Sequence, residues 1–195
     1  MGHAYRAVGW NRQKLRCDAV LGGGALLYLT AFAGTTAWLE PYATFATVAI
    51  RAAGTAAFFL LHAILAIGPL ARLDRRFLPL LSNRRHLRVT MFSLALVHGA
   101  FALVQFHGGG SANPLVSLFP AEAGAGGLGA FPFQPLGAAA LAILFLMAAT
   151  SHDFWLANLG APAWKALHML VYAAYGLLVM HVALGALQSE RSPWL

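Results

Sequence analysis

Four histidines of this sequence lie inside long apolar stretches, where packing alone gives an imidazole no role. They are His62, His98, His168 and His181. An ionisable residue inside a membrane-like environment is costly, rare and usually functional. One such histidine is explained as readily by packing as by ligation, but four in a small protein favour ligation. The other four fall in the N-terminal tail, in a loop or at helix ends, where solvation explains them (His3, His86, His107 and His152).

The acidic residues narrow the chemistry that these histidines can do. All six lie in loops or at the ends of apolar stretches (Asp18, Glu40, Asp74, Glu122, Asp153 and Glu190). A proton relay or a hydrolytic zinc centre would need carboxylates beside the imidazoles. Neutral imidazoles that face each other across an apolar gap instead suit haem iron, which takes an axial nitrogen from each side. The sequence therefore favours haem, with one or two haems bound.

The composition places these histidines in a membrane. Of the 195 residues 59% are hydrophobic and only 10% charged, against about 25% charged in soluble domains. The mean hydropathy is +0.67. The net charge of +7 lies at the ends of apolar runs, so we expect a lipid bilayer and no nucleic acid as partner. The single Cys17 and the absence of a CxxCH motif exclude a disulfide within the chain and covalent haem attachment.

Five stretches are long and apolar enough to cross a bilayer, which takes about 20 residues. We predict an all-α integral membrane protein, a bundle of five transmembrane helices in a single domain over residues 1–195. No internal repeat is evident. Pro132 and Pro135 should break or begin the fourth helix. The predicted helices cover about 19–39, 46–70, 87–106, 132–150 and 166–187.

The basic residues predict the orientation of the bundle. Eleven of the 13 Lys and Arg residues lie before the first helix, between the second and third, or before the fifth. The positive-inside rule places these segments in the cytoplasm. The N-terminus is then cytoplasmic and the C-terminus periplasmic. Arg51, near the outer end of the second helix, either pairs with a haem propionate or extends to the interface.

Depth in the membrane predicts which histidines pair. At about 1.5 Å per residue, His168 lies about 3 Å, His62 about 12 Å, His98 about 16 Å and His181 about 22 Å from the cytoplasmic helix ends. We therefore pair His98 with His181 in the outer half. His168 belongs to the inner half, with His62 as its best partner and His86 as a weaker one. His168 and His181 are about 20 Å apart along one helix, which suits two stacked haems.

The same spacing raises the question of whether His168 and His181 lie on the same face of their helix. At about 100° per residue, 13 residues end about 220° around an ideal helix, so the two histidines would not share a face. Either the fifth helix is central and contacts cofactors on two sides, or a bulge near Gly176 realigns it.

The segment TSHDFWLANLGAPAWKALHMLVYAAYGLLVMH, residues 150–181, resembles the ferric-reductase-like transmembrane domain family. Within it the likeness is to the haem-binding membrane subunit of periplasmic methionine sulfoxide reductase systems (MsrQ/YedZ type). The segments RRHLRVTMFSLALVHGAF and FPFQPLG resemble the family as well. The likeness covers about residues 50–187 and does not include His62.

The resemblance implies b-type haem with His98, His168 and His181 as ligands. It also implies electron transfer across a bacterial inner membrane to a periplasmic or membrane redox partner. No flavin or nicotinamide domain is expected, so a quinol pool or a reductase supplies the electrons; a bound flavin or quinone is not readable from the residues. We expect an electron-transfer subunit rather than a complete enzyme. The alternatives are a structural or assembly subunit with a passive or lost haem site, and a histidine-based proton or metal conduit.

Overall fold

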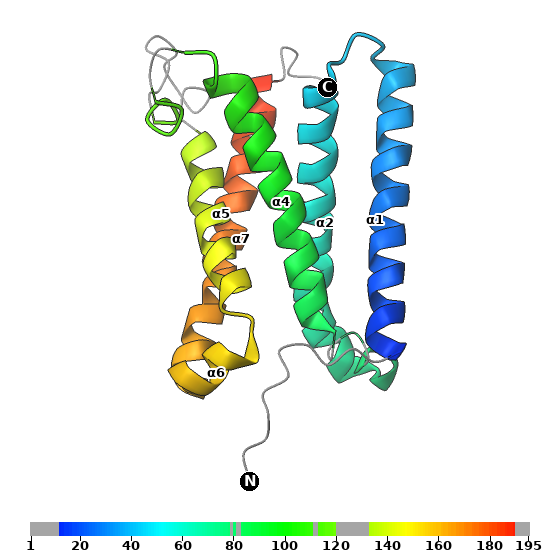
Figure 1. Cartoon of the computed structure of the whole chain (residues 1–195), viewed down its shortest axis with the longest axis vertical. Helices are drawn as coiled ribbons and strands as arrows, with labels where there is room; N and C mark the ends of the chain where they lie inside the picture. Colours follow the sequence, from blue (N-terminus) through cyan, green and yellow to red (C-terminus); the bar gives the residue numbers. More distant parts are fainter. Residues whose placement is uncertain (1–11, 79, 81–82, 111–112, 120–132, 190–195) are drawn as a thin grey trace.

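The computed structural model describes residues 12–78, 80, 83–110, 113–119 and 133–189, which form helices and turns and no strand. Figure 1 shows long helices side by side, with the start of α1 and the end of α7 at opposite ends of the bundle. In chain order the elements are α1 (Arg12–Leu39), α2 (Phe45–Leu73), the 3-10 turn η1 (Arg75–Phe77), α4 (Arg84–His107), α5 (Gln134–Ala149), α6 (Asp153–Leu159) and α7 (Ala161–Ser189).

The predicted all-helical class is confirmed, and each predicted apolar stretch coincides with one helix. Four helices are long and apolar enough to cross a membrane (Leu15–Leu39, Phe45–Leu73, Arg84–His107 and Ala161–Leu187). The helix predicted over 132–150 is Gln134–Ala149, and its 16 residues make it shorter than the other four. Pro135 lies in its first turn, as a helix start favours. Residue 132 lies outside the described residues.

Local signals explain where the helices begin and end. The Thr44 side chain accepts a hydrogen bond from the Thr47 backbone N–H and so caps α2. Asp74 ends α2 and accepts from the Arg76 backbone N–H to start η1. Gly160 separates α6 from α7 with φ 74° and ψ 155°, a conformation that is essentially restricted to glycine. The sequence does not predict α6, because its seven residues show too little periodicity.

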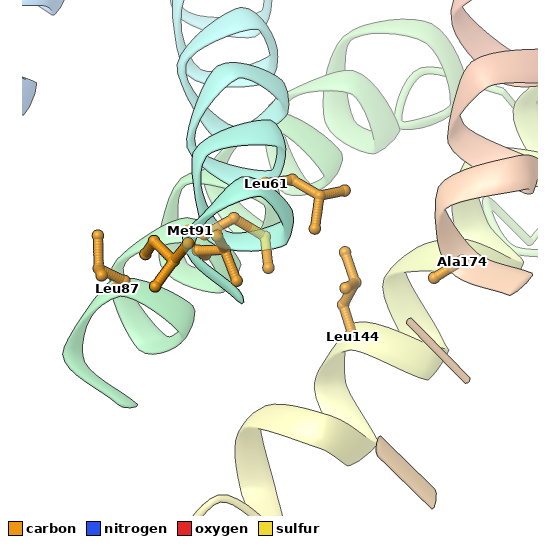
Figure 2. Packing of buried hydrophobic residues seen from close by; sticks show 7 residues of the cluster. Leu61, Leu87, Met91, Leu144 and Ala174 are labelled. Carbon is orange, nitrogen blue, oxygen red and sulfur yellow. The ribbon is translucent and has the colours of Figure 1, made fainter. Parts of the chain in front are cut away.

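The buried core lies where α2, α4, α5 and α7 meet. In Figure 2 Leu61 of α2 and Leu144 of α5 point toward each other, with Met91 of α4 and Ala174 of α7 nearby. The core is small because most apolar side chains face outward, as a bilayer requires. In the apolar window of α1 no residue is buried, and Figure 1 shows α1 at the edge of the bundle beside α2. The buried cluster consists of Leu61, Ile64, Ile67, Leu87, Met91, Leu144 and Ala174.

The four core helices form two hairpins of the same layout. The first hairpin (α2, η1 and α4) and the second hairpin (α5, α6 and α7) each run down one long helix, through a short helical turn, and up another (Figure 1). Within each hairpin the two long helices pack against each other, and α4 and α5 join the hairpins. The structure thus contains a repeat, whereas no repeat is predicted from the sequence.

Candidate functional site

His98 projects from α4 toward the backbone of α2. Its Nδ1 lies 2.9 Å from the carbonyl oxygen of Ile50. A carbonyl oxygen only accepts hydrogen bonds, so in the neutral ring Nδ1 carries the proton and Nε2 keeps its lone pair. This arrangement prepares Nε2 of His98 as a metal ligand.

His181 of α7 repeats this arrangement in the second hairpin. Its Nδ1 lies 2.9 Å from the carbonyl oxygen of Phe133, the residue that precedes α5. The Phe133 ring also contacts the imidazole, with a centroid separation of 5.3 Å. In each hairpin the histidine follows its carbonyl partner by 48 residues. Nε2 of His181 is therefore prepared in the same way.

The two prepared imidazoles lie beside each other between the hairpins. Their ring centres are 6.2 Å apart and their planes are nearly perpendicular, at 85°. Two imidazole nitrogens at the usual metal–nitrogen length of about 2.0–2.1 Å would place the ring centres about 6 Å apart. The structure thus brings together the pair that the depth count predicts, at a separation that fits one metal between them.

The number of protein ligands narrows the kinds of metal that the two imidazoles could hold. Among the described residues no group of three or more His, Cys, Asp or Glu side chains comes together to hold a metal ion. A protein-bound zinc ion usually takes three or four protein ligands. Two imidazoles on opposite sides instead suit an iron whose other positions a macrocycle fills. The residues present fit haem, and His98 and His181 are the ones that would hold it.

His168 has a buried nitrogen without a partner. Its Nδ1 lies 3.0 Å from the carbonyl oxygen of Trp164, one turn earlier in α7. The Trp164 ring stacks on the imidazole at 3.9 Å. The Met147 carbonyl lies near the ring, yet Nε2 makes no hydrogen bond of ordinary geometry. An unsatisfied buried polar group costs about 1–3 kcal/mol, so this nitrogen also has the character of a ligand.

His62 differs, because both of its ring nitrogens are engaged. Nδ1 lies 2.8 Å from the Phe58 carbonyl oxygen and Nε2 lies 3.1 Å from the Tyr175 hydroxyl. The carbonyl fixes the proton on Nδ1, so Nε2 accepts from Tyr175. The structure joins α2 to α7 through this hydrogen bond, and no contact among the described residues pairs His62 with His168.

The charged candidates are engaged with acids at the ends of helices. The Arg51 guanidinium lies 2.9 Å from Glu40, and both side chains are more than half exposed. His86 lies 2.6 Å from Asp18 and so links α4 to α1.

The structure shows how α7 directs His168 and His181, which an ideal helix places on different faces. The helix runs from Ala161 to Ser189 without interruption, so no bulge at Gly176 realigns it. It packs on α5, hydrogen-bonds to His62 of α2 through Tyr175, and brings His181 to His98 of α4. The bulge is therefore excluded, and the alternative in which this helix contacts cofactors on two sides stays a prediction.

Sequence reasoning missed the backbone and glycine partners of the paired histidines. A carbonyl oxygen carries no residue-type signal, so neither Ile50 nor Phe133 stood out. The sequence indicates Gly54 only as one of several small residues that allow close helix approach or leave room for a flat cofactor, and it does not indicate Gly137. A usable signal existed: Gly54 and His98 recur as Gly137 and His181 at a constant spacing of 83 residues.

The comparisons with known proteins identify the family of the chain. The sequence model of the family described as ferric reductase like transmembrane component matches residues 53–179, more than half of the chain. No curated protein and no solved structure matches this chain. The chain belongs to the ferric reductase-like transmembrane family, and its role is accordingly in membrane electron transfer.

Proposed function

We propose that this chain is a membrane cytochrome b that relays electrons to a partner protein through haem held by His98 and His181. The observation that carries the proposal is the placement of these two imidazoles 6.2 Å apart, each with Nδ1 bonded to a carbonyl. When bound, the haem iron gains and loses one electron and so carries charge between donor and acceptor.

The chain itself supplies orientation and a dry environment. The hydrogen bonds from Nδ1 to Ile50 and Phe133 fix each ring and raise the basicity of its Nε2. The buried apolar cluster supplies hydrocarbon-like surroundings within the bundle. A low-dielectric surrounding of this kind is one of the means by which a protein sets the potential of a haem.

His168 extends the proposed path toward the other face of the membrane. Its buried, unpartnered Nε2 supports a second haem on the inner side. The two histidines of α7 are about 20 Å apart along the helix axis, which gives an electron path across the bilayer. Electrons would enter from a quinol or a reductase on the cytoplasmic side and leave to a periplasmic or membrane partner.

The location and the partner are parts of the same proposal. The bias of Lys and Arg supports a cytoplasmic N-terminus and a periplasmic C-terminus in a bacterial inner membrane. The likeness of residues 150–181 to the membrane subunit of methionine sulfoxide reductase systems makes a periplasmic reductase of that kind the first partner to seek.

An absorption spectrum of the purified protein tests the haem. We expect a b-type α-band on reduction, and its loss in both His98→Ala and His181→Ala. His152→Asn is the matched control, because His152 caps α6 and asparagine keeps a capping oxygen. A folded protein that stays colourless with full haem supply would contradict the cytochrome and leave a structural or assembly subunit. Proton or metal flux without a chromophore would indicate a conduit.

A further inference from the structure

Gly54 and Gly137 occupy equivalent places beside the paired histidines. A Cβ atom at Gly54 would lie 2.6 Å from Nδ1 of His98, and one at Gly137 would lie 2.7 Å from Nδ1 of His181. Real Cβ atoms essentially never approach other heavy atoms so closely. Each imidazole therefore occupies the space that a side chain would fill at its glycine.

Helix geometry explains why the glycine must stand at this place. Each glycine follows the carbonyl partner of the histidine by four residues: Ile50 and Gly54 in α2, Phe133 and Gly137 at the start of α5. Residues four apart lie one above the other on a helix. That carbonyl already accepts the helical N–H four residues on, as Gly137 donates to Phe133. An imidazole that donates to the second lone pair of the carbonyl oxygen must therefore pass over the residue four positions on, which is the glycine.

The equivalence extends to the packing around the histidines. A shift of 83 residues carries His98 onto His181, Gly54 onto Gly137, and Ile50 onto Phe133. The same shift relates buried positions of the two hairpins. Ala57 and Ala140, Leu61 and Leu144, Ile64 and Met147, and Met91 and Ala174 are all at most 8% exposed.

We propose that Gly54 and Gly137 are a matched pair of positioning residues, each opening a notch in its helix through which the facing histidine reaches a backbone carbonyl. The two notches set both imidazoles beside each other between the hairpins, with their ring centres 6.2 Å apart. The effect of the two glycines on haem binding rests on the proposed function. The contact between each glycine and its histidine does not depend on haem.

The effect of the two glycines on haem binding is tested by measuring the haem affinity and the electron paramagnetic resonance signal of the ferric haem. We expect Gly54→Ala and Gly137→Ala each to weaken haem binding by about 10- to 100-fold, as loss of a ligand's outer partner does, and to shift the low-spin signal. Gly176→Ala is the matched control, since a Cβ there has no neighbour within 4 Å. Wild-type affinity and signal in both variants, an effect at only one glycine, or an equal effect at Gly176 would overturn the proposal.

A second experiment needs no haem and remains informative if a variant folds poorly. We expect Gly54→Ala to lower the thermal unfolding midpoint of the haem-free protein, and to lower it much less in a His98→Ala background. Gly137→Ala and His181→Ala should couple in the same way. If the effects of the glycine and histidine substitutions are additive in both pairs, the proposal that each glycine makes room for its histidine is contradicted. A wild-type protein that takes up no haem but shows this coupling would contradict the proposed function alone.

Discussion

His168 and His62 show how hydrogen bonding separates a ligand candidate from a packing residue. Both lie in apolar helices, and residue type alone does not distinguish them. His62 has both nitrogens engaged, by Phe58 and Tyr175. His168 has a buried Nε2 without a partner. A buried polar atom with no hydrogen bond is uncommon in folded proteins, so its presence indicates a group that the chain alone does not satisfy.

This difference predicts the haem content of two variants. We expect His168→Ala to lose one haem and to keep the haem of His98 and His181, whose ligands come from elsewhere in the bundle. His62→Gln should keep full haem content, because His62 offers no free nitrogen. The ratio of haem to protein, measured as the pyridine haemochrome, checks both. Haem loss in His62→Gln together with none in His168→Ala would contradict the assignment.

The pairing of the histidines could be predicted from the sequence only in part. Helices have a fixed rise, so the position of a residue along a span gives its depth, and His98 and His181 were paired on that basis. Depth does not give the direction around the helix axis. His62 was therefore paired with His168, whereas the structure turns it toward Tyr175.

The helices themselves were the most predictable elements, because a bilayer demands about 20 apolar residues and the chain shows each such run plainly. The turn between α6 and α7 was not predictable to the same degree. It depends on one backbone conformation at Gly160, with φ 74°, and no other glycine among the described residues has a positive φ. The repeat was not predictable from the sequence because few residue types recur at equivalent positions of the two hairpins. Similar aliphatic residues also occur throughout the chain.

Gly160 gives a prediction about the stability of this turn. A Cβ there would meet only Pro162, at 3.9 Å, so the cost of Gly160→Ala lies in the backbone rather than in crowding. We expect a loss of about 1–3 kcal/mol and a lower unfolding midpoint in detergent. Gly34→Ala, a helical glycine with open space around it, should be neutral or stabilising. Equal midpoints for the two variants would show that the turn is not strained.

The bundle as a whole separates its charges between two ends. The η1 turn and α6 lie at the same end of the bundle as the start of α1, and the end of α7 lies at the other (Figure 1). Eleven of the 13 Lys and Arg residues fall in the segments that the positive-inside rule places in the cytoplasm. Opposite faces of the protein would therefore meet the electron donor and the acceptor, and the orientation decides which partner can reach which histidine.

Single introduced cysteines test this orientation and the number of crossings. In a Cys17→Ser background, we place cysteines at Arg76 in η1, Asn113 after α4, Asn158 in α6 and Leu187 at the end of α7. A membrane-impermeant maleimide applied to spheroplasts should label positions 113 and 187, and should label 76 and 158 only after lysis. The reversed pattern would place the N-terminus outside. Labelling of 158 but not 187 in intact spheroplasts would show that the short helix α5 does not cross, and would leave His181 at the wrong face for a periplasmic acceptor.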